Sequence, residues 1–102
     1  MWHTSVRLLL MGLIFIGQPA FAHYPAMQCT LLDRLIECEV GFSDGSKAVG
    51  KPVRLIDYDE NVLVVKKADR FSRVTFDKPE GEFYIQFDSG HEFPVEMDYA
   101  EF

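Results

Sequence analysis

The sequence predicts an all-β fold, a small antiparallel β-sandwich of about six or seven strands that follows a cleaved signal peptide. Two observations carry this prediction. Short apolar or alternating segments recur about every 8–12 residues with turn-forming residues between them, which is typical of small sandwiches. No window of the chain carries apolar residues at the spacing of an amphipathic helix.

The segment 1–22 has the features of a secretory signal peptide. Arg7 precedes an apolar run at 8–16, and the segment 20–22 (Ala-Phe-Ala) has the small residues at alternate positions that signal peptidase recognises. The apolar run is about half of the ~20 residues that a membrane-spanning helix needs. Cleavage leaves a single domain, 23–102, which we expect to be periplasmic or secreted and to contain no membrane span.

The exported form is acidic. The chain has 10 basic and 16 acidic side chains, and the leader removes only Arg7 from these, so that the formal net charge falls from −6 to −7. Such a surface repels phosphate backbones, which argues against nucleic acid as a partner, whereas it attracts cations weakly. A domain of this size has a small core and is only marginally stable unless a cross-link such as a disulfide stabilises it.

The first two strands are expected to form a hairpin about Asp33-Arg34. A two-residue turn there places Cys29 opposite Cys38 in a closely spaced, non-hydrogen-bonded pair. Cysteines so placed in an oxidising compartment usually form a disulfide, and a metal site that includes cysteine is the alternative. The same register directs one set of side chains into the core, namely Cys29, Leu31, Ile36, Cys38, Val40 and Phe42.

The later strands are each bounded by turn residues. They are expected at 53–57, 62–65, 74–76, 83–87 and 93–97. The connections are the loop 43–46, the polar turn 58–61, the charged turn region 66–73, the strand-ending segment 78–81 and the loop 88–91. The clearest alternation of apolar and polar residues lies in 83–87, which predicts a strand with one buried face.

The stretch 43–88 resembles the transthyretin-like and carboxypeptidase-regulatory-like extracellular modules, which are seven-strand sandwiches. The resemblance rests on the order of its parts: a Ser-Asp-Gly-Ser loop, a turn at Gly50-Lys51-Pro52, two strands, a charged turn and an aromatic strand after Pro-x-Gly-x-Phe. It implies a fold of this class and says little about activity.

Three short segments carry a more specific resemblance. They are His23 at the predicted mature start, Phe42-Ser43-Asp44-Gly45-Ser46, and Asp88-Ser89-Gly90-His91-Glu92 followed by Val95-Glu96. Together they resemble the small extracytoplasmic subunit of nickel and cobalt uptake transporters of the energy-coupling-factor type. The resemblance implies a metal-binding accessory protein whose partners are the membrane subunits of a metal uptake transporter.

Cleavage after Ala22 would give His23 a free α-amine beside its imidazole, and these two nitrogens can chelate one metal ion. A second imidazole, from His91, would complete a T-shaped set of three nitrogens, which suits Cu(II) or Ni(II). Asp88 and Glu92 are candidates for a further ligand or a hydrogen-bond acceptor, and Met27 for a soft axial ligand of copper. The ordinary alternatives are a chance first residue, a solvated loop histidine, solvated carboxylates and a core methionine.

The sequence lacks the nucleophile, phosphate-binding and metalloprotease motifs of common enzymes, so we expect no catalysis. The predicted function is capture of a divalent transition metal, nickel or cobalt with copper as a further candidate, for uptake. The rival interpretation is a non-catalytic, transthyretin-like envelope interaction module without metal. In both cases four aromatic residues are expected to pack rather than to recognise a ligand: Tyr84, Phe87, Phe93 and Tyr99.

Overall fold

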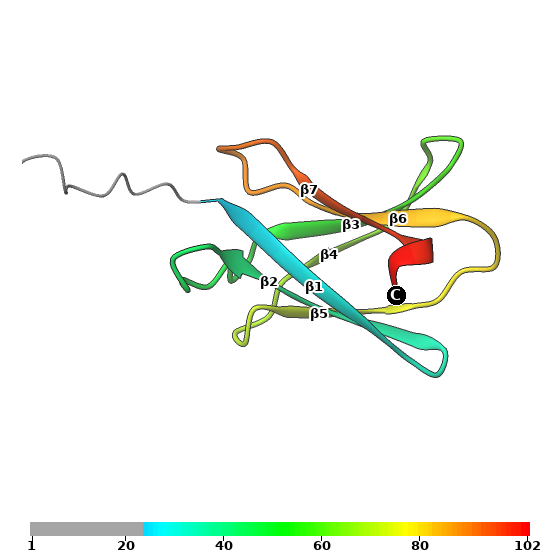
Figure 1. The fold of residues 1–102 in the computed structure, drawn as a ribbon, viewed down its shortest axis with the longest axis horizontal. Coiled ribbons are helices and arrows are strands. Elements are labelled where there is room, and N and C mark those ends of the chain that lie inside the picture. The colour runs from blue at the N-terminus through cyan, green and yellow to red at the C-terminus, as the bar shows by residue number, and fades with distance from the viewer. Residues whose placement is uncertain (1–23) are drawn as a thin grey trace, which may run out of the picture.

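A computed structural model describes residues 24–102, and this part of the chain has the predicted all-β fold (Figure 1). The strands are β1 Pro25–Leu32, β2 Leu35–Phe42, β3 Pro52–Asp57, β4 Val62–Lys67, β5 Arg73–Asp77, β6 Phe83–Phe87 and β7 Val95–Asp98, followed by the 3-10 turn η2 Tyr99–Glu101. Two antiparallel sheets have the orders β1-β2-β5 and β4-β3-β6-β7. The predicted signal peptide and His23 lie outside the described residues. Within the described range, no helix is long and apolar enough to cross a membrane.

The β1–β2 hairpin has the predicted register. Cys29 lies opposite Cys38, the two sulfur atoms form a disulfide, and the two Cα atoms are 4.0 Å apart. Asp33 closes the two-residue turn in the left-handed conformation with a φ of 59°. Aspartate tolerates this conformation better than most residues because its short polar side chain can bond the local backbone. The hairpin therefore presents both cysteines to the interior, as expected.

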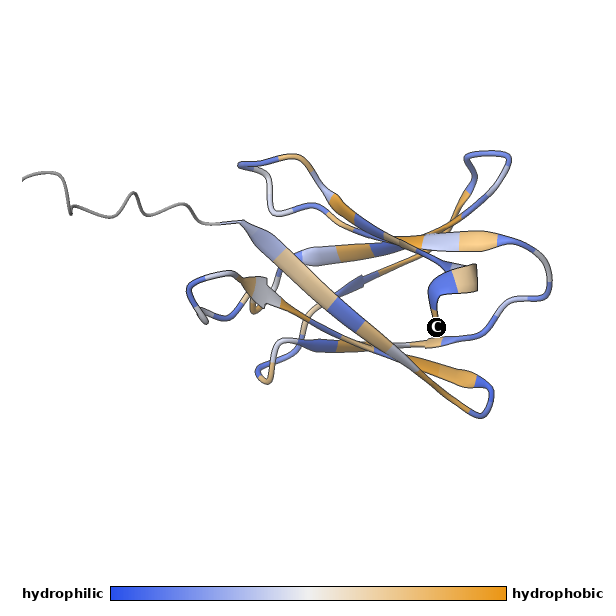
Figure 2. Ribbon diagram, in the orientation of Figure 1, coloured by the Kyte–Doolittle hydropathy of each residue, from blue (hydrophilic) through white to orange (hydrophobic). Residues whose placement is uncertain are grey.

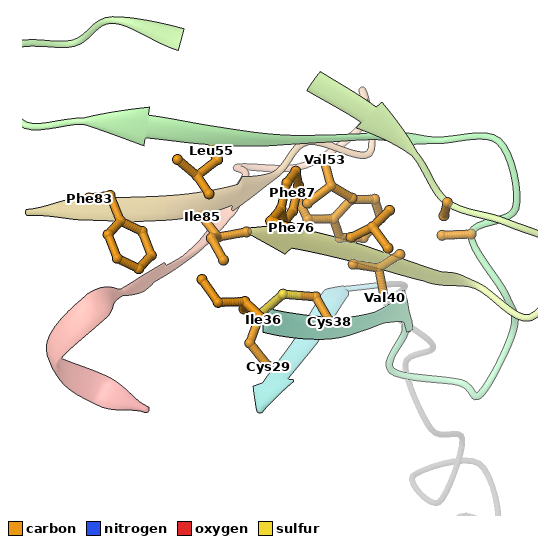
Figure 3. Close-up of a cluster of buried hydrophobic side chains, with 13 residues drawn as sticks. Cys29, Ile36, Cys38, Val40, Val53, Leu55, Phe76, Phe83, Ile85 and Phe87 are labelled. Carbon is orange, nitrogen blue, oxygen red and sulfur yellow. A yellow bond between two sulfur atoms is a disulfide. The ribbon is translucent and has the colours of Figure 1, made fainter. Parts of the chain in front are cut away.

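The core lies between the two sheets and is built from alternate residues of the central strands. In β6, Phe83, Ile85 and Phe87 are buried, whereas Tyr84 and Gln86 are partly exposed, so the predicted alternation is confirmed. Figure 3 shows these side chains meeting those of the cysteine-bearing sheet, with the disulfide inside the same cluster. Figure 2 shows that hydrophilic residues gather in the turns at the ends of the strands.

Ser72 is a buried polar residue that joins three segments distant in sequence. Its hydroxyl donates to the carbonyl of Val40 in β2 and accepts from the N–H of Ala48, with 2.7 Å between the nitrogen and oxygen atoms. The Val40 N–H in turn donates to the Ser72 carbonyl at 2.9 Å. Because each buried polar group has a partner, this connection fixes the β2–β3 loop and the β4–β5 loop against β2 without an unpaired donor.

The predicted charged turn 66–73 is shorter than expected. Lys66 and Lys67 belong to β4 and pair with Val53 and Pro52 of β3, and Arg73 begins β5. Charged residues are compatible with β4 because it is an edge strand whose side chains all remain exposed. Only residues 68–72 form the connection.

The last strand begins two residues later than predicted, at Val95 rather than at 93. Pro94 has no N–H to donate to a ladder, which explains why the pairing with β6 starts after it. Phe93 consequently lies in the loop and is 91% exposed, so the prediction that it packs in the interior is wrong. The other three aromatic residues of that set do pack: Phe87 is buried, and Tyr84 and Tyr99 are half-buried.

Candidate metal centre

The first described residue, Tyr24, is fixed to the loop that follows β2. Its N–H donates to the Ser43 hydroxyl oxygen at 3.1 Å, and the Ser43 N–H donates to the Tyr24 carbonyl at 2.8 Å. These bonds continue the β1–β2 pairing beyond Pro25 and Phe42. The peptide nitrogen that links Tyr24 to His23 is therefore held beside Ser43, although His23 itself lies outside the described residues.

The loop at 43–46 is built by its own side chains. The Asp44 carboxylate accepts from the Ser46 N–H at 3.0 Å and from the Ser46 hydroxyl at 2.7 Å, so that Asp44 caps its own turn. The ring of Phe42, at the end of β2, packs edge-on against Phe87 at the end of β6, with 6.1 Å between the ring centroids. This contact brings the loops that follow β2 and β6 to the same end of the sandwich (Figure 1).

His91 lies in the β6–β7 loop and faces the 43–46 loop. It is exposed, and together with Glu92 it lines a hollow whose other wall is Phe42 and Ser46. Its backbone N–H donates to the Ser89 hydroxyl at 3.4 Å. Its imidazole ring makes no hydrogen bond with any residue in the range 24–102. The imidazole is thus available to a ligand that enters from the side of the 43–46 loop.

The other candidate ligands differ in how available they are. Glu92 lines that hollow with His91, and Asp88 lines a second hollow together with both of them. One oxygen of Asp88 accepts from the Gly90 N–H at 2.9 Å and so builds the loop. Met27 is half-buried and packs against the core, which agrees with the ordinary alternative for this residue. Glu92 is therefore the carboxylate that borders His91 on the side of the 43–46 loop.

Residues 24–102 alone contain no group of three or more histidine, cysteine, aspartate or glutamate side chains placed to hold a metal ion. The two cysteines are joined to each other in the core, so no free thiol lies in the described part of the chain. His91 and its neighbouring carboxylates, Asp88 and Glu92, therefore do not form such a group among the described residues.

A second polar cluster, which sequence patterns did not reveal, lies on sheet β4-β3-β6-β7 around three tyrosines. The Tyr58 hydroxyl donates to Asp98, and this hydrogen bond is the main cause that raises the pKa of Tyr58 to about 12. Burial and a 3.0 Å hydrogen bond to Glu60 raise the pKa of Tyr84, and the negative charge of Glu82 raises the pKa of Tyr99. These phenols link the β3–β4 turn, β6 and the carboxyl-terminal turn.

We expect the absorbance of ionised tyrosine to show a step near pH 12 that disappears in Tyr58→Phe. The neutral phenol donates to Asp98, so its pKa in the folded state lies above the ordinary value of 10.0. The stabilisation from this bond is complete below pH 10 and is lost as the pH rises through about 12. Asp98→Asn should move the step to lower pH. A step that survives in Tyr58→Phe would contradict this assignment.

The acidic run after β3 has a structural role within its turn. The Asp57 carboxylate accepts from the N–H groups of Asp59 and Asn61 and from the Asn61 side-chain amide, at 2.8 to 3.1 Å. The Asn61 N–H is the largest cause that lowers the pKa of Asp57. This carboxylate is satisfied by protein donors within the turn.

Comparisons with protein-family models, with curated proteins and with solved structures found no match to this chain.

Proposed function

We propose that the exported chain captures a divalent transition metal, nickel or cobalt with copper as a further candidate, through His23 and His91. The metal is cargo, received outside the cytoplasm and passed to the membrane subunits of an uptake transporter. The role is one of binding and delivery rather than catalysis. The disulfide between Cys29 and Cys38 agrees with an exported protein, because such bonds persist in oxidising compartments.

One observation carries the proposal: the loop at 43–46 is bordered on one side by Tyr24 and on the other by His91. His23 is one peptide bond from the anchored nitrogen of Tyr24. A free amine and imidazole at that position would approach the hollow that His91 and Glu92 line. Two segments more than sixty residues apart in sequence thus border the same loop.

The donor set explains the preferred ions. One amine and two imidazoles supply three nitrogens, which suit tetragonal Ni(II) or Cu(II), and Glu92 can add a carboxylate oxygen. The acidic surface, with a formal net charge of −6 for the whole chain, favours the approach of any cation. Selectivity then comes from the nitrogen ligands, because exposed carboxylates alone do not distinguish among divalent ions.

The α-amine provides the sharpest test. We expect calorimetric titration with Ni²⁺ and Cu²⁺ to show tight binding to a chain that begins at His23. Binding should be lost when the α-amine of His23 is acetylated, because its nitrogen then belongs to an amide and no new amine takes its place. His91→Ala should lower affinity by at least the ~10–100-fold that loss of a supporting partner costs a metal site. Phe93→Ala is the matched control, since Phe93 is 91% exposed in the same loop and has no ligand atom.

Two outcomes would contradict the proposal. Equal affinity in the chains with a free and with an acetylated α-amine would show that the amine is not a ligand. Absence of binding in both would favour the interaction module without metal.

A further inference from the structure

The edge strand β4 is exposed on both faces. Its central residues are Val62, Leu63, Val64 and Val65, which are 51%, 48%, 38% and 52% exposed. The other edge strands have no such run: β5 alternates exposed polar residues with the buried Val74 and Phe76, β1 has polar residues among its exposed positions, and β7 has only four residues. Four consecutive exposed apolar residues on an open edge are unusual, because such an edge is a template for pairing with another strand.

The backbone of β4 is free to accept a further strand. The Ala68 N–H donates to the Lys51 carbonyl at 2.9 Å, and this bond shows which residues of β4 hydrogen-bond to β3. Bonded and non-bonded pairs alternate along an antiparallel ladder, so Lys66 and Val64 bond to β3. Val65 and Lys67 therefore direct their N–H and C=O groups away from β3. Pro52, which lies opposite Lys67, has no N–H, as expected at a pair that is not hydrogen-bonded.

Charges at the two ends of β4 are opposite in sign. The turn before it carries Asp59 and Glu60, and its last two residues are Lys66 and Lys67. An antiparallel copy of the same strand would place its lysine end beside this acidic turn, twice, about a two-fold axis. A parallel copy would bring like charges together. The pattern is thus complementary to itself in one orientation only, with the apolar residues at the centre.

We propose that β4 is the docking edge for β4 of a second copy of this chain. The two strands pair antiparallel, and the sheets β4-β3-β6-β7 of both copies become one continuous sheet. The second copy fits better than an unrelated peptide because the edge provides both the apolar centre and the opposite charges that its own partner needs. The proposal is independent of metal binding, since β4 contributes none of the candidate ligands.

Of the two lysines, Lys67 is the one available to a partner. The Lys66 ammonium group donates to the Thr75 carbonyl of β5 and lies 5.7 Å from the centroid of the Phe76 ring. It is therefore engaged within its own copy. Asp59 is exposed and uses its backbone N–H, not its carboxylate, in the turn hydrogen bond to Asp57. Asp59 and Lys67 are the pair with which to test the charge pattern.

The first experiment compares two matched lysine substitutions by sedimentation velocity over a range of concentrations. Val65 and Leu32 are both 52% exposed, but Leu32 lies at the β1–β2 hairpin, in the other sheet. We expect the exported chain to show a monomer–dimer equilibrium. Val65→Lys should raise its dissociation constant at least ~10-fold, because pairing would then bring a charged side chain into the apolar centre of the joined edges, and Leu32→Lys should leave it unchanged. A chain that stays monomeric, or a dimer insensitive to Val65→Lys, would overturn the proposal.

The second experiment uses charge reversal, which does not depend on how well Val65→Lys folds. Lys67→Glu and Asp59→Lys should each weaken the dimer, and the double variant should restore it, because antiparallel pairing brings these two positions together. Arg34→Glu makes the same change of charge at the hairpin turn and is the control. Weakening by both single variants without restoration in the double variant would reject the self-complementary arrangement.

Discussion

Phe87→Ala is expected to lower the free energy of unfolding by about 3–5 kcal/mol, the usual cost of removing a buried aromatic side chain. Phe87 is fully buried, pairs with Val53 of β3 within its sheet, and packs against the ring of Phe42 from the other sheet. The substitution would leave a cavity between the two layers. Small domains are stable by only about 5–15 kcal/mol, so this loss should be visible as a large shift in urea unfolding.

Two controls separate this cavity from a general effect of losing an aromatic ring. Phe87→Leu retains most of the volume and should cost less than Phe87→Ala. Phe93→Ala removes the same ring from an exposed position and should change stability by no more than about 0.5 kcal/mol. If Phe87→Ala changed the free energy of unfolding as little as Phe93→Ala, this would contradict the packing described between the sheets at this end of the sandwich.

Replacing Cys29 and Cys38 together by alanine is expected to cost roughly 2–3 kcal/mol, the scale for a disulfide that closes a short loop. The bond links adjacent strands of one hairpin, so it constrains the unfolded chain over a separation of 9 residues. Both cysteines are buried, 3% and 0% exposed, and alanine fits there without a new polar group. Urea unfolding of the oxidised chain and of the double variant measures the difference.

Metal affinity should change little in the same double variant. The disulfide lies within the core cluster, whereas the hollow beside His91 is lined by Phe42, Ser46, His91 and Glu92. Mild reduction of the native chain should also leave nickel binding intact. A large fall in affinity after reduction would instead implicate thiolates as ligands and would revive the cysteine-containing metal site as the alternative.

The strands that sequence predicted well are those whose signal is local. The alternation in Phe83–Phe87 and the two-residue turn at Asp33 follow from residues close in sequence, and the hairpin register follows from that turn. The pairing of β3 with β6, the link made by Ser72 and the exposure of β4 depend on contacts between distant segments. A single sequence carries no local signal for such contacts.

The candidate site was predictable only in its parts. His91 and Glu92 were singled out by chemistry, and the Ser-Asp-Gly-Ser loop by its turn residues, but no pattern indicated that this loop would form the other wall of the hollow. That arrangement depends on the packing of Phe42 against Phe87, two residues in different sheets. Phe93 was misassigned because an aromatic residue before a proline looks like the start of a strand, whereas Pro94 delays the pairing.

The hydrogen bonds between Tyr24 and Ser43 bear on the timing of maturation. If signal peptidase cuts after Ala22, only His23 separates the scissile bond from residues already incorporated in a sheet. Proteases act on chain that is exposed and not yet hydrogen-bonded. Under that hypothesis, removal of the leader and closure of the β1–β2 edge would compete for the same few residues, and a chain that folded first would shield the scissile bond.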